Sequence, residues 1–128
     1  MRRGAYVDGP LPAGQVARHA LLVAATMGTL RRPAVVSHQS AAVLIGLPLW
    51  EVPLDRVHIT RRPPASSQAT GPLRAHVARL RDDEVMTVEG LAVTDPTRTV
   101  LDLARSLPFE SAVVAVDAAL NANLVSGT

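Results

Sequence analysis

Hydrophobic residues recur every three to four positions near the start of the chain, and this spacing predicts an amphipathic helix over residues 15–30. The predicted helix closes before Pro33. Ser37 then precedes a second apolar run and is a good N-cap for a short helix over residues 39–45, with Gly46 as its expected left-handed C-cap. The apolar stripe of the first helix consists of Val16, Ala20, Val23 and Met27.

The middle of the chain changes to a period of two, which is typical of half-buried strands. Residues 56–60 and 73–78 both alternate between apolar and polar side chains. Residues 61–71 between them are rich in Pro, Ser and Thr and predict an exposed loop. Residues 85–93 predict a hairpin around a tight turn at Glu89–Gly90.

Helical spacing returns near the end of the chain. Asp95 is a strong N-cap with Pro96 at the first helical position, and the helix is expected to run to about Arg105 and to bury Val100, Leu101 and Ala104. Pro108 opens a last helix. Its expected buried stripe is Phe109, Ala112, Val113, Val116 and Leu120. The elements together predict an α+β fold in which a small, mostly antiparallel sheet packs with about four helices.

Composition narrows the class of protein. A chain of 128 residues with 48% hydrophobic residues is long enough for one domain with its own core. Cysteine is absent, which excludes disulfides, thiolate nucleophiles and zinc–cysteine sites. The longest apolar run, residues 20–25, is far shorter than a membrane span, and no apolar signal core follows the basic start. We therefore expect a cytoplasmic protein that does not enter a membrane.

Charge is unevenly distributed along the chain. Residues 1–81 hold eleven arginines against three acidic residues, a balance of +8, whereas residues 82–128 have a balance of −6. A basic portion of this kind suits phosphate groups or an acidic partner. Attraction between the two portions within one fold explains the pattern equally well.

Candidate metal ligands are limited to four histidines, His19, His38, His58 and His76. The last two are expected side by side on paired strands. A metal site needs a third and a fourth ligand, and no carboxylate lies at ligand spacing nearby. Polar residues on the outer side of a half-exposed sheet explain both histidines as well, so we predict no metal site.

Candidate catalytic groups are equally sparse. Ser37 and His38 are adjacent, but Ser37 is better used as a helix cap and neighbouring residues on a helix point apart. The acidic run 82–84 is typical of a solvated turn, Asp95 of a cap, and Asp102 of a surface or arginine-paired position. Glycine-rich phosphate loops are absent. We therefore predict a protein that is not an enzyme and uses no cofactor.

A basic patch in the sequence favours nucleic-acid binding. The sequence lacks the aromatic residues of a single-strand platform and a helix with the polar cluster of a major-groove reader. The candidate phosphate-contacting residues are Arg2, Arg3, Arg61, Arg62, Arg74 and Arg79.

Three stretches in combination resemble a known family. They are residues 35–50 (VVSHQSAAVLIGLPLW), 57–61 (VHITR) and 88–104 (VEGLAVTDPTRTVLDLA). Their order resembles the actinobacterial AbiEi-type antitoxins of type IV toxin–antitoxin systems. Many relatives also carry a C-terminal endonuclease-like domain of the very-short-patch-repair, DUF559 type. The resemblance covers roughly residues 1–122.

The resemblance implies a function. In that family an N-terminal winged helix binds DNA and represses its own promoter, and the following region serves toxin antagonism or regulation. Residues 2–7 resemble the last strand of the wing, so we expect residues 1–9 to be a wing remnant and residues 10–128 a single antitoxin-like domain from a truncated gene. The expected partner is a cognate toxin, with DNA as a partner only if a winged helix is encoded upstream.

Two alternatives remain open at this stage. One is a nucleic-acid-binding module that uses the six arginines. The other is the docking portion of a truncated DUF559-type endonuclease-like protein. The sequence leaves the oligomeric state undetermined.

Overall fold

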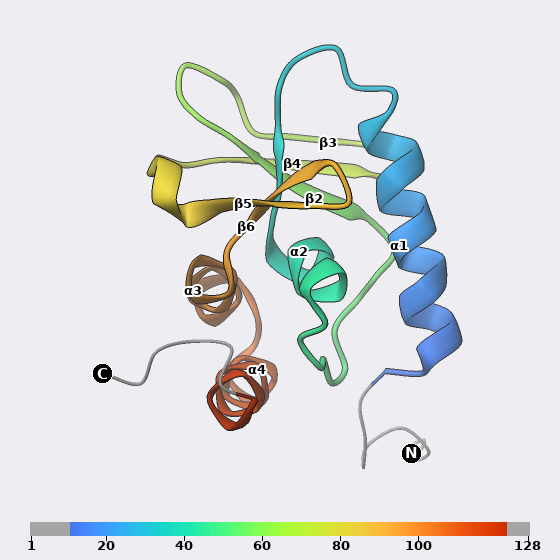
Figure 1. Cartoon of the computed structure of the whole chain (residues 1–128), viewed down its shortest axis with the longest axis vertical. Coiled ribbons are helices and arrows are strands. Elements are labelled where there is room, and N and C mark those ends of the chain that lie inside the picture. The colour runs from blue at the N-terminus through green and yellow to red at the C-terminus, as the bar shows by residue number, and fades with distance from the viewer. Residues whose placement is uncertain (1–10, 123–128) are drawn as a thin grey trace.

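Four helices and one six-stranded sheet build the part of the chain that the computed structural model describes, residues 11–122 (Figure 1). The predicted α+β class is confirmed. The helices are α1 (Ala13–Met27), α2 (His38–Ile45), α3 (Pro96–Ser106) and α4 (Phe109–Asn121). The strands are β1 (Val35–Val36), β2 (Val57–Arg61), β3 (Gln68–Thr70), β4 (Leu73–Val77), β5 (Val85–Val88) and β6 (Leu91–Thr94).

The sheet is mixed, with the strand order β3-β4-β2-β1-β6-β5. The antiparallel neighbours are β3 with β4, β2 with β1, and β6 with β5. The parallel neighbours are β4 with β2 and β1 with β6. Strand β1 has only two residues, yet it lies at the centre and joins the two halves of the sheet. The predicted wing remnant, residues 1–9, lies outside the described residues.

Local sequence signals fix several boundaries as predicted. Gly46 ends α2 with a φ of 80°, a left-handed conformation that glycine adopts without strain. The β5–β6 hairpin turns at Glu89 and Gly90, which both have positive φ. Asp95 caps α3 by accepting a hydrogen bond from the backbone N–H of Arg98 at 2.8 Å.

Two strands were not predicted. Strand β3 lies inside the predicted loop 61–71, and all three of its residues are exposed, so it carries no alternation of buried and exposed positions. Strand β1 is too short for a periodicity. Its position was visible only as the apolar pair before Ser37.

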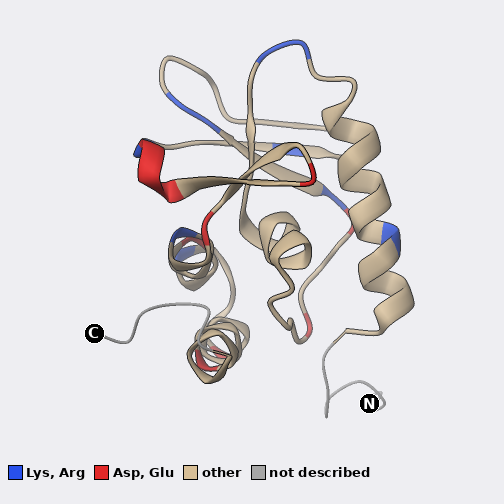
Figure 2. Cartoon of the chain, in the orientation of Figure 1, with Lys and Arg blue, Asp and Glu red and all other residues tan. Residues whose placement is uncertain are grey.

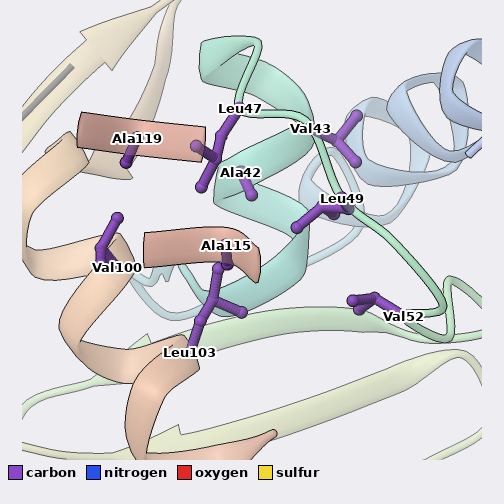
Figure 3. Close-up of a cluster of buried hydrophobic side chains, with 9 residues drawn as sticks. All are labelled: Ala42, Val43, Leu47, Leu49, Val52, Val100, Leu103, Ala115 and Ala119. Atoms are coloured by element: carbon purple, nitrogen blue, oxygen red, sulfur yellow. The ribbon is translucent and has the colours of Figure 1, made fainter. Parts of the chain in front are cut away.

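Two hydrophobic clusters hold the layers together. One lies between the sheet and the helices α1 and α2, where Val23 packs with Val36, Val57 and Ile59. The other joins α2, α3 and α4 and includes Ala42, Leu47, Leu103 and Ala115 (Figure 3). Helices α3 and α4 lie side by side below the sheet, whereas α1 runs down the right-hand side of the view, in contact with α2 and β2 (Figure 1).

The buried faces of α3 and α4 differ from the prediction. In α3, Val100 is buried as expected, but Leu101 is 40% exposed and Ala104 is exposed, whereas Leu103 is fully buried. In α4 the buried residues are Ala112, Ala115 and Ala119, and Phe109, Val113 and Leu120 of the predicted stripe are exposed. Small alanine side chains let α4 approach α3 closely, so the packed face is the alanine face and the larger side chains lie beside it.

Candidate functional site

The six predicted phosphate-contacting arginines occupy different environments. Arg2 and Arg3 lie outside the described residues. Arg62 donates from its Nε to the carbonyl of Leu80 at 2.8 Å and pairs with Asp82 at 3.2 Å. The Arg74 side chain donates to the carbonyl oxygens of Gln68 and Ala75. Arg79 is exposed, and Arg61 is only 9% exposed.

The uneven charge of the sequence is partly balanced within the fold. The acidic run forms a 3-10 helix, Asp82–Glu84, at one end of the sheet (Figure 2). Asp82 pairs with Arg62 at 3.2 Å, and Asp83 pairs with Arg81 at 2.9 Å. The Arg62–Asp82 contact joins the basic portion of the chain to the acidic portion, as expected if the two portions attract each other within one fold, whereas the Arg81–Asp83 contact is local. Each is exposed, so each adds little stability.

Arg98 is the most fully paired charge in the described residues, and the sequence did not single it out. Its Nε donates to the carboxylate of Asp102 at 3.0 Å, and its guanidinium also contacts Glu84 and the carbonyl of Arg79. Burial raises the pKa of Asp102 even though Arg98 opposes that shift. Of the two positions expected for Asp102, surface or arginine-paired, the structure shows the second, within α3 itself. The contacts of Arg98 with Glu84 and with the carbonyl of Arg79 tie α3 to the segment that follows β4.

Three histidines meet where α2 begins beside the sheet. The ring of His38 stacks on that of His76 with a centroid distance of 3.8 Å. Nδ1 of His58 lies 2.9 Å from Nε2 of His76, so the two rings share a hydrogen bond. The parallel pairing of β2 with β4 brings these two side chains together, as we predicted. We call these three residues the histidine stack.

The Ser37–His38 pair contradicts the sequence interpretation. Ser37 Oγ lies 2.8 Å from Nδ1 of His38 and makes no side-chain cap of α2. His38, the first residue of α2, has a φ of 56°, a left-handed conformation that is uncommon for a residue other than glycine, and its ring lies against Ser37. Thr60 donates to the same Ser37 oxygen at 2.7 Å. Ser37 is 0% exposed, so its hydroxyl cannot reach a substrate as a nucleophile would have to.

Protonation of the histidine stack is suppressed. Burial is the main cause that lowers the pKa of His38 to about 3 and those of His58 and His76 to about 4. The positive charge of Arg74 contributes to each of these shifts. The rings are therefore neutral at pH 7, and their mutual hydrogen bond and stacking need no counter-ion.

His19 belongs to a second buried network beside the stack. Its Nε2 lies 2.9 Å from Ser40 Oγ, and its Nδ1 lies 3.0 Å from the carbonyl of Leu54. Ser40 Oγ also accepts the backbone N–H of His58. Within residues 11–122, no group of three or more His, Cys, Asp or Glu side chains has the arrangement of a metal site. The histidine stack joins α2, β2 and β4, whereas the His19 network joins α1, α2 and β2, and both act as polar parts of the core.

The exposed residues of α4 form an apolar groove against α3. Phe109 is 81% exposed at the start of α4, and Val113 and Leu120 are also exposed. The groove has a volume of about 360 Å³ and one acidic residue, Asp117, on its wall. We call it the α3–α4 groove, and its remaining residues are Ala104, Ala112 and Val116. The sequence analysis identified these apolar residues but predicted that they would be buried in the core.

A second hollow is basic. It has a volume of about 510 Å³ beside the end of β2, and Arg32, Arg61 and Arg62 line it. None of its described lining residues is acidic. We call it the arginine hollow, and its other residues include Pro33, Ala34, Val35, Pro64 and Ala65. Arg32 was not among the predicted contact residues.

Comparison with known proteins gives no relative from which a role could be taken. The sequence matches no protein-family model, and no curated protein matches it. None of the helices within residues 11–122 is long and apolar enough to cross a membrane.

Proposed function

We propose that this chain is a non-catalytic, antitoxin-like or transcriptional-regulator-like domain of a type IV toxin–antitoxin system, and that it acts by binding a protein. The observation that carries the proposal is the α3–α4 groove, where Phe109 is 81% exposed beside Val113, Val116 and Leu120. Contiguous apolar surface with an exposed aromatic residue is typical of protein interfaces.

The energy available at this surface is substantial. Burying a side chain such as Phe109 contributes roughly 1.5–3 kcal/mol relative to leaving it in water. A central aromatic residue of this kind often dominates an interface energetically, and smaller apolar neighbours exclude water around it. Val113 and Leu120 are such apolar neighbours, because they line the groove with Phe109 on the same face of α4.

The chemistry of the buried polar groups supports a role without catalysis. Ser37 is fully buried, and the histidine stack is neutral and hydrogen-bonded internally. Groups in that condition stabilise a fold and are poor nucleophiles or proton carriers at pH 7. The resemblance of three stretches to AbiEi-type antitoxins supports the choice of a toxin as the protein partner.

A binding measurement tests the proposal. A nucleotidyltransferase-like toxin, the partner expected for an AbiEi-type antitoxin, is titrated with the wild-type chain, with Phe109→Ser and with Leu21→Ser. Leu21 is 72% exposed on α1, away from α4, so it controls for the loss of an exposed apolar side chain. We expect Phe109→Ser to weaken binding roughly 30-fold or more, the loss that defines an interface hot spot, and Leu21→Ser to leave it unchanged.

Two results would contradict the proposal. Equal affinity of the wild type and Phe109→Ser for the toxin would show that the α3–α4 groove is not the contact surface. Failure of the wild-type chain to bind the toxin, combined with a concentration-dependent dimer that Phe109→Ser abolishes in sedimentation, would assign the groove to self-association.

A further inference from the structure

The arginine hollow carries a charge that the described fold leaves uncompensated. Arg61 is only 9% exposed, and its Nε has no hydrogen-bond partner among the described residues. A buried polar group without a partner costs about 1–3 kcal/mol, and a buried cation costs more. The charge of the buried Arg98, by contrast, is compensated, because its guanidinium contacts two carboxylates and a carbonyl oxygen. The Arg61 side chain lacks that arrangement.

A second cation lies close to Arg61. Burial and, to a lesser extent, the positive charge of Arg32 lower the pKa of Arg61. Both residues line the same hollow with Arg62, whose side chain is held by Leu80 and Asp82. Two arginines that repel each other around a hollow without acidic walls create a local positive potential. Such a potential attracts anions.

The walls indicate how large the anion is. Besides the arginines, the hollow is lined by small apolar side chains and prolines from the segments before β1 and after β2. Its volume of about 510 Å³ lies within the usual range of small-molecule sites, roughly 300–1,000 Å³. A bare phosphate would leave most of this space empty, whereas a sugar or base attached to the phosphate would contact the apolar walls.

We infer that the arginine hollow binds the phosphate group of a nucleotide unit, with Arg32 and Arg61 as the charged contacts. Guanidinium groups suit phosphate because their N–H donors match its oxygens in a fork geometry. The nucleotide unit belongs either to a free nucleotide or to a nucleic-acid strand, since both present the same phosphate. This site is separate from the α3–α4 groove and does not depend on the function proposed for it.

Binding of defined probes to the full chain tests the inference. Adenosine monophosphate, inorganic phosphate and a fluorescent single-stranded oligonucleotide are titrated at low salt, with NMR shifts and fluorescence anisotropy as readouts. Arg32→Gln is the test variant, because Arg32 is exposed and its loss should not affect folding. Arg31→Gln is the matched control: it removes the same charge from the neighbouring exposed position, which does not line the hollow.

We expect adenosine monophosphate to bind and Arg32→Gln to weaken it about tenfold, the effect of one lost charge-assisted contact. Arg31→Gln should bind as the wild type does, and the shifts should centre on residues 32–35 and 60–65. Tighter binding of the oligonucleotide with the same dependence on Arg32 would identify a strand as the source of the phosphate. Weaker binding would identify a free nucleotide.

Three results would overturn the inference. They are no binding of any probe at low salt, equal losses in Arg31→Gln and Arg32→Gln, and shifts that lie outside the hollow. Arg61→Gln gives a second check, because removing an unpartnered buried cation should raise the unfolding temperature while binding is lost. An unchanged affinity in a folded Arg61→Gln variant would also refute it. Phe109→Ser should bind all probes normally, which separates this site from the proposed protein interface.

Discussion

Acidification from pH 7 to pH 5 should destabilise the fold through the histidine stack. The pKa of His38 is about 3 in the fold, and those of His58 and His76 are about 4, whereas the ordinary value is 6.5. Between pH 6.5 and about 4 the unfolded chain therefore binds protons that the folded chain excludes. The stability linked to the neutral rings is fully present above this window and is lost as the pH falls through it.

The magnitude follows from these pKa differences. At pH 5, a histidine whose pKa drops from 6.5 to about 4 on folding costs ~2 kcal/mol of stability relative to pH 7. His58 and His76 are only partly buried, and solvent near the rings reduces the effect to about 1 kcal/mol each. His38 is buried and keeps about 2 kcal/mol, so for the three rings together we expect the free energy of unfolding to fall by about 4 kcal/mol. That is a large part of the stability of a domain of this size.

Urea denaturation at a series of pH values measures this loss directly. The midpoint should fall steadily from pH 7 to pH 5 while the slope of the transition stays constant. NMR titration of the imidazole protons supplies the independent check, since the three rings should remain neutral until below pH 5. The variant His76→Asn removes the ring that touches both others, so its stability should depend on pH much less than that of the wild type.

The reasoning fails if the urea midpoint is the same at pH 7 and pH 5. It also fails if the three rings titrate near pH 6.5 in the folded protein, because the stack would then be open to water. An equally steep pH dependence in His76→Asn would assign the effect to other groups.

Three further predictions concern the packing of α3. Leu103→Ala should lower the free energy of unfolding by about 2–5 kcal/mol in urea denaturation, because Leu103 is fully buried between three helices; a loss below that range would mean that the site collapses around the smaller side chain. Asp95→Ala should cost about 1 kcal/mol in the same assay, because the N-cap hydrogen bond is lost, and Asp95→Asn should retain most of the stability. Arg98→Met should cost about 3–5 kcal/mol by leaving Asp102 charged and buried, and the double variant Arg98→Met/Asp102→Leu should recover much of that loss; a double variant no more stable than Arg98→Met would argue against the buried-charge explanation.

Much of the fold could be predicted because its boundaries depend on local chemistry. Three boundaries are set by the backbone conformation of the residues at the boundary, so they can be predicted without knowing any distant contact. They are the Asp95–Pro96 helix start, the Glu89–Gly90 turn and the Gly46 helix end. The strand alternation that buries Val57 and Ile59 was visible for the same reason. Strand β3 was missed because the only strand it pairs with is β4 and all three of its residues are exposed. Its sequence therefore lacks the alternation of apolar and polar residues that predicts a strand.

The candidate sites depended on contacts that a sequence does not contain. Helix α4 is apolar around most of its circumference, so the pattern could not choose between the face with Phe109 and the alanine face that packs on α3. The contact of Ser37 with His38 depends on the positive φ of His38, which is unusual for a residue other than glycine. Arg32 and Arg61 converge only because β1 and β2 pair in their observed register.

The two-residue strand β1 has a consequence for how the chain folds. The β5–β6 hairpin and the β3–β4 hairpin each bring together residues that are close in the sequence, and they can form early. The pairing of Val36 with Val93 instead closes a loop that spans about half of the described chain, which carries an entropic cost. The halves of the sheet should therefore join late, in the rate-limiting step. Until then, the edges of β2 and β6 are open to pairing with other chains, so slow folding at high concentration should favour aggregation.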